Sequence, residues 1–221
     1  MTSAKQIYIA SRRGPALPYD SEVEYIESTG TQWIDTGVIP NQSSISEIKC
    51  QTDTPNANPG FFFAGARSES GMNSYTYQKA TKGVFYSEYG QGNYCEMASA
   101  DAMWHVFRIE PPYIFMDGNR KTYNDPTQSA FTTPHNFILH GCWQDAGRNV
   151  LGNKKIAYFK FSQGGVLTRD LISVRFTNEQ GVSEGAMYDR LGVGGMNPDG
   201  SPRTDGLYRN RGTGVFVFPT A

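Results

Sequence analysis

Hydrophobic and polar residues alternate in short runs along most of the chain, and this two-residue period is typical of half-buried β-strands. In residues 43–53, apolar side chains such as Ile45 are separated by polar ones. Residues 61–66 are instead continuously apolar and of strand length, so we expect a strand buried on both faces. Further strands are predicted at residues 23–25, 31–38, 73–78, 84–89, 94–97, 103–110, 113–116, 120–123, 137–142 and 155–161.

The alternation also predicts which side chains share a face of a strand. In residues 84–89 we expect Phe85 and Tyr89 on one side, with Val84 and Tyr86 on the other. In residues 155–161 we expect two opposite sets: Ala157, Phe159 and Phe161, and Ile156, Tyr158 and Lys160.

Turn residues close these runs and indicate the fold class. Asp117-Gly118 lies between two strand-like runs and predicts a tight β-hairpin. The chain lacks the regular alternation of strands and helices that marks a parallel sheet. We therefore predict an all-β fold, an antiparallel β-sandwich, with a closed barrel as the structural alternative.

The first twenty residues differ from the rest of the chain. Residues 5–10 are β-like, and the sequence SRRGPALPY at 11–19 then interrupts them with a glycine and two prolines. We interpret residues 1–20 as an N-terminal arm or linker and residues 21–221 as a single domain.

Charge, hydropathy and cysteine content exclude several classes of function. The net charge of −1 provides no basic field to hold phosphates, so we do not expect nucleic acid as a partner. No apolar run approaches the ~20 residues of a membrane helix, and no signal-peptide core is present. Cys50, Cys95 and Cys142 form no CxxC pair and are expected to be reduced, buried thiols. These features predict synthesis in a reducing cytoplasm without membrane insertion.

Two parts of the chain carry a specific resemblance. The first is EYIESTGTQWIDTGVIPN at residues 24–41, and the second comprises KIAYFKF at 155–161, the stretch 165–190 and LYRNRGTGVF at 207–216. Through them the chain resembles the laminin-G-like, concanavalin-type jelly-roll domains found in proteins of gut bacteria and their phages. The resemblance extends over residues 21–218, and the longer loop at 192–206 departs from the family pattern.

The resemblance implies a concanavalin-type jelly-roll in which the first and last segments lie near each other. Gly212 and Gly214 would then supply a turn into a last strand at residues 215–218. A charge-and-hydroxyl network that holds loops in place would be formed by Arg169, Asp170, Tyr188, Asp189 and Arg190.

Related jelly-rolls include glycoside hydrolases, which need two carboxylates placed for acid and nucleophile roles. The three glutamates at 22, 24 and 27 fall in the opening segment, and Glu88 and Glu96 lie in separate strands. His105 lies inside a predicted strand, where we expect a packed or hydrogen-bonded ring, and no GxSxG motif marks a nucleophile. We therefore expect no catalytic residues.

A calcium site is one interpretation of the polar loop near the C-terminus. Asn197, Asp199, Ser201 and Asp205 place oxygen atoms at intervals suited to Ca²⁺. The spacing lacks the closing glutamate of an EF-hand, so a turn-rich polar loop without a cofactor explains it better.

A carbohydrate site is predicted where aromatic and planar polar groups follow a strand end. Its candidate residues are Trp143, Gln144, Asp145, Arg148 and Asn149. Trp33, Tyr75, Tyr77 and Tyr89 are further aromatic candidates, although aromatic residues of a sandwich usually belong to its core.

We interpret the chain as a non-catalytic, virion-associated structural or decoration protein of a phage, with a lectin-like domain for surface glycans. The arm would attach it to other virion proteins, and cell-surface or mucin glycans would be its ligands. A virion assembled in the host cytoplasm reconciles an extracellular type of domain with reduced cysteines. Two alternatives stay open: a bacterial carbohydrate-binding or adhesion module at the cell surface, and a glycoside hydrolase. The sequence also leaves the oligomeric state open.

Overall fold

The alternating runs form strands throughout the computed structural model, which describes residues 17–56, 60–68, 73–125, 127, 130–149, 152–195, 201 and 203–219. These residues contain strands, turns and loops and no helix. The first nine strands are β1 Ser21–Glu22, β2 Ile26–Ser28, β3 Ile34–Asp35, β4 Ser44–Gln51, β5 Phe61–Arg67, β6 Ser74–Lys79, β7 Val84–Gly90, β8 Tyr94–Ser99 and β9 His105–Glu110. The other nine are β10 Tyr113–Met116, β11 Asn119–Thr122, β12 Ile138–Leu139, β13 Cys142–Gln144, β14 Gly147–Asn149, β15 Lys154–Gln163, β16 Val166–Thr177, β17 Ser183–Asp189 and β18 Leu207–Tyr208.

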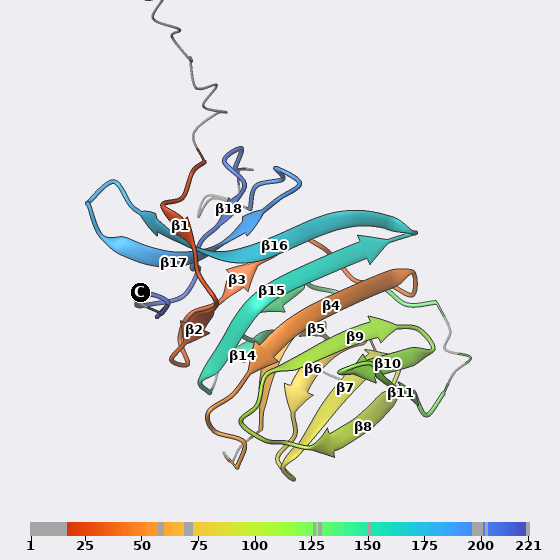
Figure 1. Ribbon diagram of the computed structural model, residues 1–221. Coiled ribbons are helices and arrows are strands. Elements are labelled where there is room, and N and C mark those ends of the chain that lie inside the picture. Colours follow the sequence, from red (N-terminus) through yellow and green to blue (C-terminus); the bar gives the residue numbers. More distant parts are fainter. Residues whose placement is uncertain are drawn as a thin grey trace, which may run out of the picture.

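The strands form two sheets that pack against each other (Figure 1). The ten-stranded sheet has the order β11-β10-β9-β4-β15-β16-β17-β18, with β1 beside β16 and β2 beside β15. The eight-stranded sheet has the order β14-β13-β5-β6-β7-β8, with β12 joining β3 to β5. All pairs are antiparallel except β13 with β5. The predicted all-β antiparallel sandwich is therefore confirmed, and the two sheets do not close into one barrel.

The core lies between the sheets and is rich in aromatic rings. Phe159 of β15 stacks on Phe137 at 5.2 Å between ring centres, and Phe107 of β9 lies against Phe85 of β7 at 5.2 Å. β5 is buried along almost its whole length, as its continuous apolar run predicts. All three cysteines are free and buried, as expected.

Hydroxyl groups buried in this core bond the two sheets together. Ser46 of β4 shares hydrogen bonds with the hydroxyls of Tyr75 at 3.0 Å and Tyr77 at 2.6 Å, both on β6. The Tyr77 hydroxyl also accepts the backbone N–H of Ile109 from β9 at 3.1 Å. Each of these three hydroxyls thus finds a partner, and these bonds fix how the sheets stack. Tyr75, Tyr77 and Tyr89 belong to the core and not to a surface site.

The predicted faces of β15 are wrong in its first half. Ile156 is fully buried on the core side together with Phe159 and Phe161, whereas we expected it opposite them. The cause is a β-bulge, because the register of β15 on β4 shifts between Ile156 and Tyr158. One extra residue reverses the alternation at that point.

The opening segment of the domain lies in a fork between β15 and β16. β15 pairs with β16 from Tyr158 onward, but its first residues, 154–156, pair with β2 instead. The end of β16 pairs with β1, so residues 21–28 fill the space where the two long strands separate (Figure 1). Tyr19 and Asp20 of the predicted arm already contact this sheet, and residues 1–16 lie outside the described part.

The last segment meets the first one, but it is not the strand we predicted at residues 215–218. Only Val217 forms a bridge, exchanging two backbone hydrogen bonds with Glu27 at 2.7 and 3.0 Å. Upstream, the N–H of Arg211 donates to the carbonyl of Trp33 at 2.8 Å. Side-chain and loop contacts therefore replace a regular strand at this end.

Candidate functional site

The predicted carbohydrate residues lie on one hairpin, formed by β13 and β14. Trp143 stands directly opposite Arg148, and Gln144 opposite Gly147, with Asp145 in the turn between the strands. Side chains alternate between the two faces of a strand, so this hairpin divides the five predicted residues between two different environments.

Trp143 and Arg148 form a closed stack against the sandwich. The guanidinium carbon of Arg148 lies 4.1 Å from the centre of the Trp143 ring and 4.3 Å from that of Trp33. His135 stacks on Trp143 with the planes 3° apart and bonds Asp145 at 2.6 Å. Trp33 itself is only 7% exposed. These contacts occupy ring surface that a sugar would need, so the stack mainly fastens the hairpin to the fold.

Gln144 and Asn149 lie instead at a pocket of 430 Å³ on the outer face of the eight-stranded sheet. We call it the outer-face pocket; its lining residues are Gly60, Phe62, Arg67, Gln78, Lys79, Ala80, Thr81, Tyr86, Glu88, Gln144 and Asn149. The pocket thus combines residues from β5, β6, β7, β13 and β14 with the turn after β6.

The strand period and register explain this gathering. Along β7, Phe85 and Tyr89 point into the core, so Tyr86 and Glu88 point outward, as the sequence predicted for Tyr86. Gln78 of β6 stands opposite Tyr86 on one side and opposite Phe62 of β5 on the other. Three neighbouring strands therefore contribute one outward side chain each to the same row.

Glu88 is the single carboxylate among the described residues that line this pocket. It lies 3.5 Å from Arg67, and the two side chains are 16% and 22% exposed. Burial raises the pKa of Glu88, while the Arg67 charge and hydrogen bonds from Ser74 and Gln78 lower it in part. The Arg67 charge thus offsets much of the cost of a buried carboxylate.

An aromatic surface continues beyond the pocket. Tyr86 stacks on Tyr94 of β8 with ring centres 5.4 Å apart and planes 19° apart, and Tyr94 is 43% exposed. Glu96, the other strand glutamate, stands opposite Tyr86 and forms an ion pair with Lys82. The outer face therefore offers ring surface and polar groups side by side.

Three of the five residues of the predicted loop-holding network, Asp170, Asp189 and Arg190, are in contact. The fully buried carboxylate of Asp189 accepts the N–H groups of Asp170 at 3.1 Å and Leu191 at 3.0 Å. Arg190 bonds Asp170 at 3.1 Å. Arg169 points elsewhere and donates to the carbonyl of Thr36 at 2.9 Å.

Tyr188 stands apart from that network, because its ring packs on Tyr19 at 4.9 Å. Burial raises the pKa of Asp189, and the two backbone N–H groups lower it in part. These contacts fasten β16 and β17 to each other.

Two of the four proposed calcium ligands, Asn197 and Asp199, lie outside the described residues. Of the other two, Asp205 is bonded to Arg203 and Arg209 and accepts the N–H of Leu207 at 3.0 Å. Burial raises the pKa of Asp205, but the hydrogen bonds from Arg203 and Leu207 and the charges of Arg203 and Arg209 together outweigh it and lower the pKa. Within the part of the chain that the structure describes, no group of three His, Cys, Asp or Glu side chains is arranged for a metal ion.

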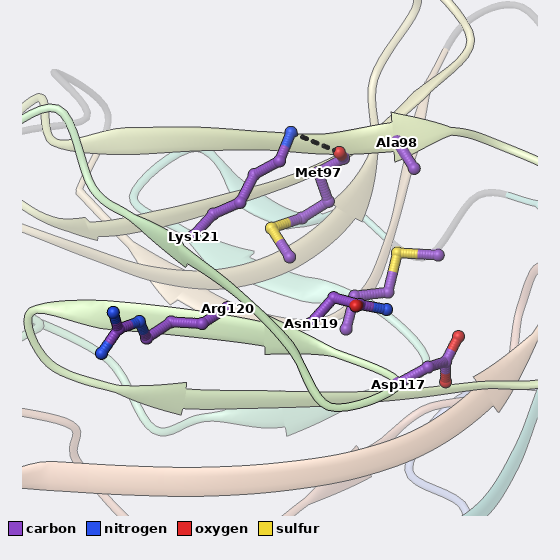
Figure 2. Close-up of a pocket in the computed structure, with 7 residues that line it drawn as sticks. Met97, Ala98, Asp117, Asn119, Arg120 and Lys121 are labelled. Carbon is purple, nitrogen blue, oxygen red and sulfur yellow. Dashed lines mark hydrogen bonds between the residues drawn. The ribbon is translucent and has the colours of Figure 1, made fainter.

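A second, smaller pocket of 170 Å³ opens at the edge of the sandwich, between β8 and the β10–β11 hairpin (Figure 2). Met97, Ala98 and Met116 give it apolar walls, and Lys121 closes one side by donating to the carbonyl of Met97 at 2.6 Å. We call it the edge pocket. The sequence did not predict either pocket, because each is formed by strands that come together only in the fold.

Comparison with known proteins adds no family: no protein-family model and no curated protein matches the chain. In the described residues no helix is long and apolar enough to cross a membrane.

Proposed function

We propose that this chain is a non-catalytic glycan-binding protein whose outer-face pocket holds the sugar. The observation that supports this most is the combination of a half-buried tyrosine with planar amide groups in one open pocket. Tyr86 supplies a ring face, and Gln78, Gln144 and Asn149 supply amides within the same lining. Aromatic faces and planar hydrogen-bonding groups are what sugar rings and their hydroxyls require.

The charge of the pocket favours binding over hydrolysis. Glycoside hydrolysis in its common form needs two carboxylates on either side of the scissile bond. Among the described residues the outer-face pocket presents Glu88 alone, held by Arg67, while Glu96 is paired with Lys82 outside the lining. A glycoside hydrolase is therefore the less supported alternative.

The place of this protein in a phage particle is the broader part of the proposal. It rests on the resemblance of residues 24–41, 155–161, 165–190 and 207–216 to laminin-G-like, concanavalin-type domains and on the arm of residues 1–20. In this proposal the domain decorates the virion and presents the outer-face pocket to surface glycans. A bacterial adhesion module would use the same pocket, so the binding experiment serves both.

Binding is tested with a glycan array followed by calorimetry of the glycans that are retained. We expect Tyr86→Ala and Gln144→Ala to lose at least about tenfold in affinity, equivalent to about 1.4 kcal/mol. Tyr113→Ala, which removes a half-buried tyrosine from the other sheet, is the matched control and should bind normally. An array without any retained glycan contradicts the proposal, as does equal binding by all three variants.

Attachment is tested by removing residues 1–16, which leaves the contacts of Tyr19 and Asp20 intact. We expect a folded, glycan-binding protein that no longer enters particles. Incorporation at the normal level contradicts the anchoring role of the arm without affecting the binding proposal.

A further inference from the structure

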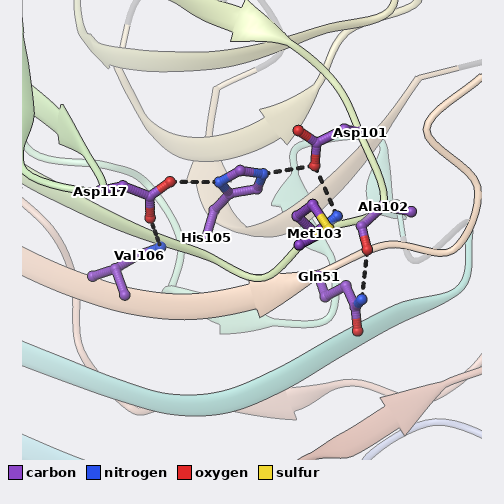
Figure 3. A network of polar contacts seen from close by, with 7 residues as sticks. All are labelled: Gln51, Asp101, Ala102, Met103, His105, Val106 and Asp117. Carbon is purple, nitrogen blue, oxygen red and sulfur yellow. Dashed lines mark hydrogen bonds and ion pairs between the residues drawn. The ribbon is translucent and has the colours of Figure 1, made fainter.

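His105, at the start of β9, is held between two aspartates (Figure 3). Its Nδ1 lies 2.6 Å from Oδ2 of Asp117, and its Nε2 lies 2.8 Å from Oδ1 of Asp101. The three side chains come from different elements: the loop before β9, β9 itself, and the turn between β10 and β11.

The turn holds Asp117 in a defined position. Asp117 and Gly118 both have positive φ, 50° and 79°, which is the backbone of the tight hairpin predicted from Asp-Gly. The other carboxylate oxygen of Asp117 accepts the N–H of Val106 at 2.9 Å. Asp101 is fixed in the same way, because it accepts the N–H of Met103 at 2.7 Å. Both carboxylates are therefore positioned before they meet the ring.

The number of protons on the two ring nitrogens determines the charge of His105. A carboxylate only accepts hydrogen bonds, and a neutral imidazole carries one N–H, so it can donate to one carboxylate alone. The side chains of Asp101 and Asp117 are 51% and 44% exposed, so both carboxylates stay in contact with water. Two such contacts at 2.6 and 2.8 Å require an imidazolium with both nitrogens protonated.

Two other described neighbours of the ring, Cys50 and Phe85, are uncharged. Cys50 of β4 stands opposite His105, and burial raises the pKa of its thiol well above the usual value, so it stays neutral. On the β7 side the neighbour is the ring of Phe85, at 4.9 Å. Lys121 and Arg120 line the edge pocket beside Asp117, and Lys121 is bonded to carbonyls of β8.

We propose that Asp101, His105 and Asp117 form a pH-operated lock on the open edge of the sandwich. The imidazolium ties the loop at 101–103 to the turn that forms one wall of the edge pocket. When the ring loses a proton it releases one aspartate, and the loop that carries the exposed Met103 separates from the turn. The lock is independent of glycan binding in the outer-face pocket.

The direction of the pH response follows from linkage. Burial alone lowers the pKa of His105, but the bonds to Asp117 and Asp101 outweigh it and raise the pKa above 6.5. A raised pKa in the folded state means that the lock is fully present below pH 6.5 and is lost as the pH rises through the folded-state value.

The test is a pH titration of the His105 ring by NMR in the full chain. We expect a ring pKa above 6.5 in the wild type, and a fall of at least about one unit in Asp117→Asn. Asp145→Asn, the same change at the partner of His135, is the control and should leave the His105 titration unchanged. A His105 pKa at or below 6.5, or one that Asp117→Asn does not move, overturns the proposal.

Opening is measured separately by hydrogen exchange of the Met103 and Val106 amides in the wild type. These amides donate to the two aspartates, so we expect their protection to fall once the pH exceeds the ring pKa. Protection that is constant across that pH range would show that the ring titrates without opening the edge, and it would overturn the lock.

Discussion

Three buried basic side chains of this protein, His105, Lys154 and His140, have pKa values that are shifted in different directions. Two carboxylates raise the pKa of His105, whereas burial lowers the pKa of Lys154 from 10.5 to about 7. Lys154 packs its ammonium 5.9 Å from the centre of the Phe61 ring. Burial and the nearby Lys154 charge also lower the pKa of His140 well below 6.5. The stability of the fold therefore depends on pH through groups that act in opposite directions.

Replacing Lys154 with methionine should stabilise the protein most at pH 7 and below. Between the folded value near 7 and the unfolded value of 10.5, the unfolded chain binds the extra proton, so wild-type stability rises with pH in that window. Lys154→Met removes the buried ammonium, so the gain, on the order of a few kcal/mol, should shrink towards pH 10. Urea unfolding at several pH values measures it.

Its neighbour in β15 provides the control. Lys155 is paired with Asp53 at 2.7 Å; burial lowers its pKa, but the bond to Asp53 outweighs this and raises it. The difference between Lys155→Met and the wild type should thus stay constant from pH 7 to 9. If the stability difference between Lys154→Met and the wild type is also constant over this range, Lys154 is charged in the folded protein and its pKa is not lowered by burial.

The sequence predicted the environment of single residues better than it predicted which residues they contact. His105 was expected to be packed or hydrogen-bonded inside a strand, and it is. Its two aspartates were not predicted, because Asp117 reaches it only through the β9–β10 pairing and the hairpin turn. Trp143 was predicted to follow a strand end, but its stack with Arg148 depends on the register of β13 on β14, and the neighbouring pocket depends on the register of β13 on β5.

Strands were predicted well where the sequence pattern that marks them involves only neighbouring residues. Alternation and turn residues located most strands within a few positions, since both depend on neighbouring residues alone. The β15 faces failed at a bulge, which has no sequence mark in KIAYFKF. The last strand failed because Val217 pairs only with Glu27, almost the full chain length away. Pairing partners at such distances are not encoded in any local pattern.

The contact between the end and the beginning of the domain depends on one glycine. A Cβ at Gly212 would lie 1.8 Å from the carbonyl oxygen of Thr31, a distance that no two such atoms adopt. Gly212→Ala must therefore displace the segment that bonds Trp33, and we expect a loss of more than about 2 kcal/mol in unfolding free energy. Thermal and urea unfolding measure this loss.

Gly92→Ala separates crowding from backbone strain. Gly92 has a positive φ of 62° and nothing near its missing Cβ, so alanine there should cost only about 1 kcal/mol. Equal losses for the two variants would mean that the approach to Thr31 contributes nothing.

At the scale of the whole molecule, one continuous cluster of buried side chains draws on both sheets. Cys50, Cys95 and Cys142 lie in β4, β8 and β13, and burial raises the pKa of each thiol. Buried thiols of raised pKa react slowly, so all three report local opening. We expect them to become reactive to a thiol reagent at the same urea concentration, because the two sheets unfold together.

Mass spectrometry of pulse-labelled protein distinguishes the three sites. Chains that carry one or two labels at intermediate urea, with Cys95 modified first, would show instead that the β8 edge opens separately from the rest.

The fork that holds residues 21–28 has a consequence for biosynthesis. β2 is among the first strands to be made, but its partners are residues 154–156 of β15 and Val217, which is 190 positions after Glu27. At about 5–20 residues per second, a ribosome needs about 10–40 s to cover that distance. Throughout that interval the nascent chain keeps Ile26 and its neighbours in water, so the domain can complete its fold only after Val217 has been made.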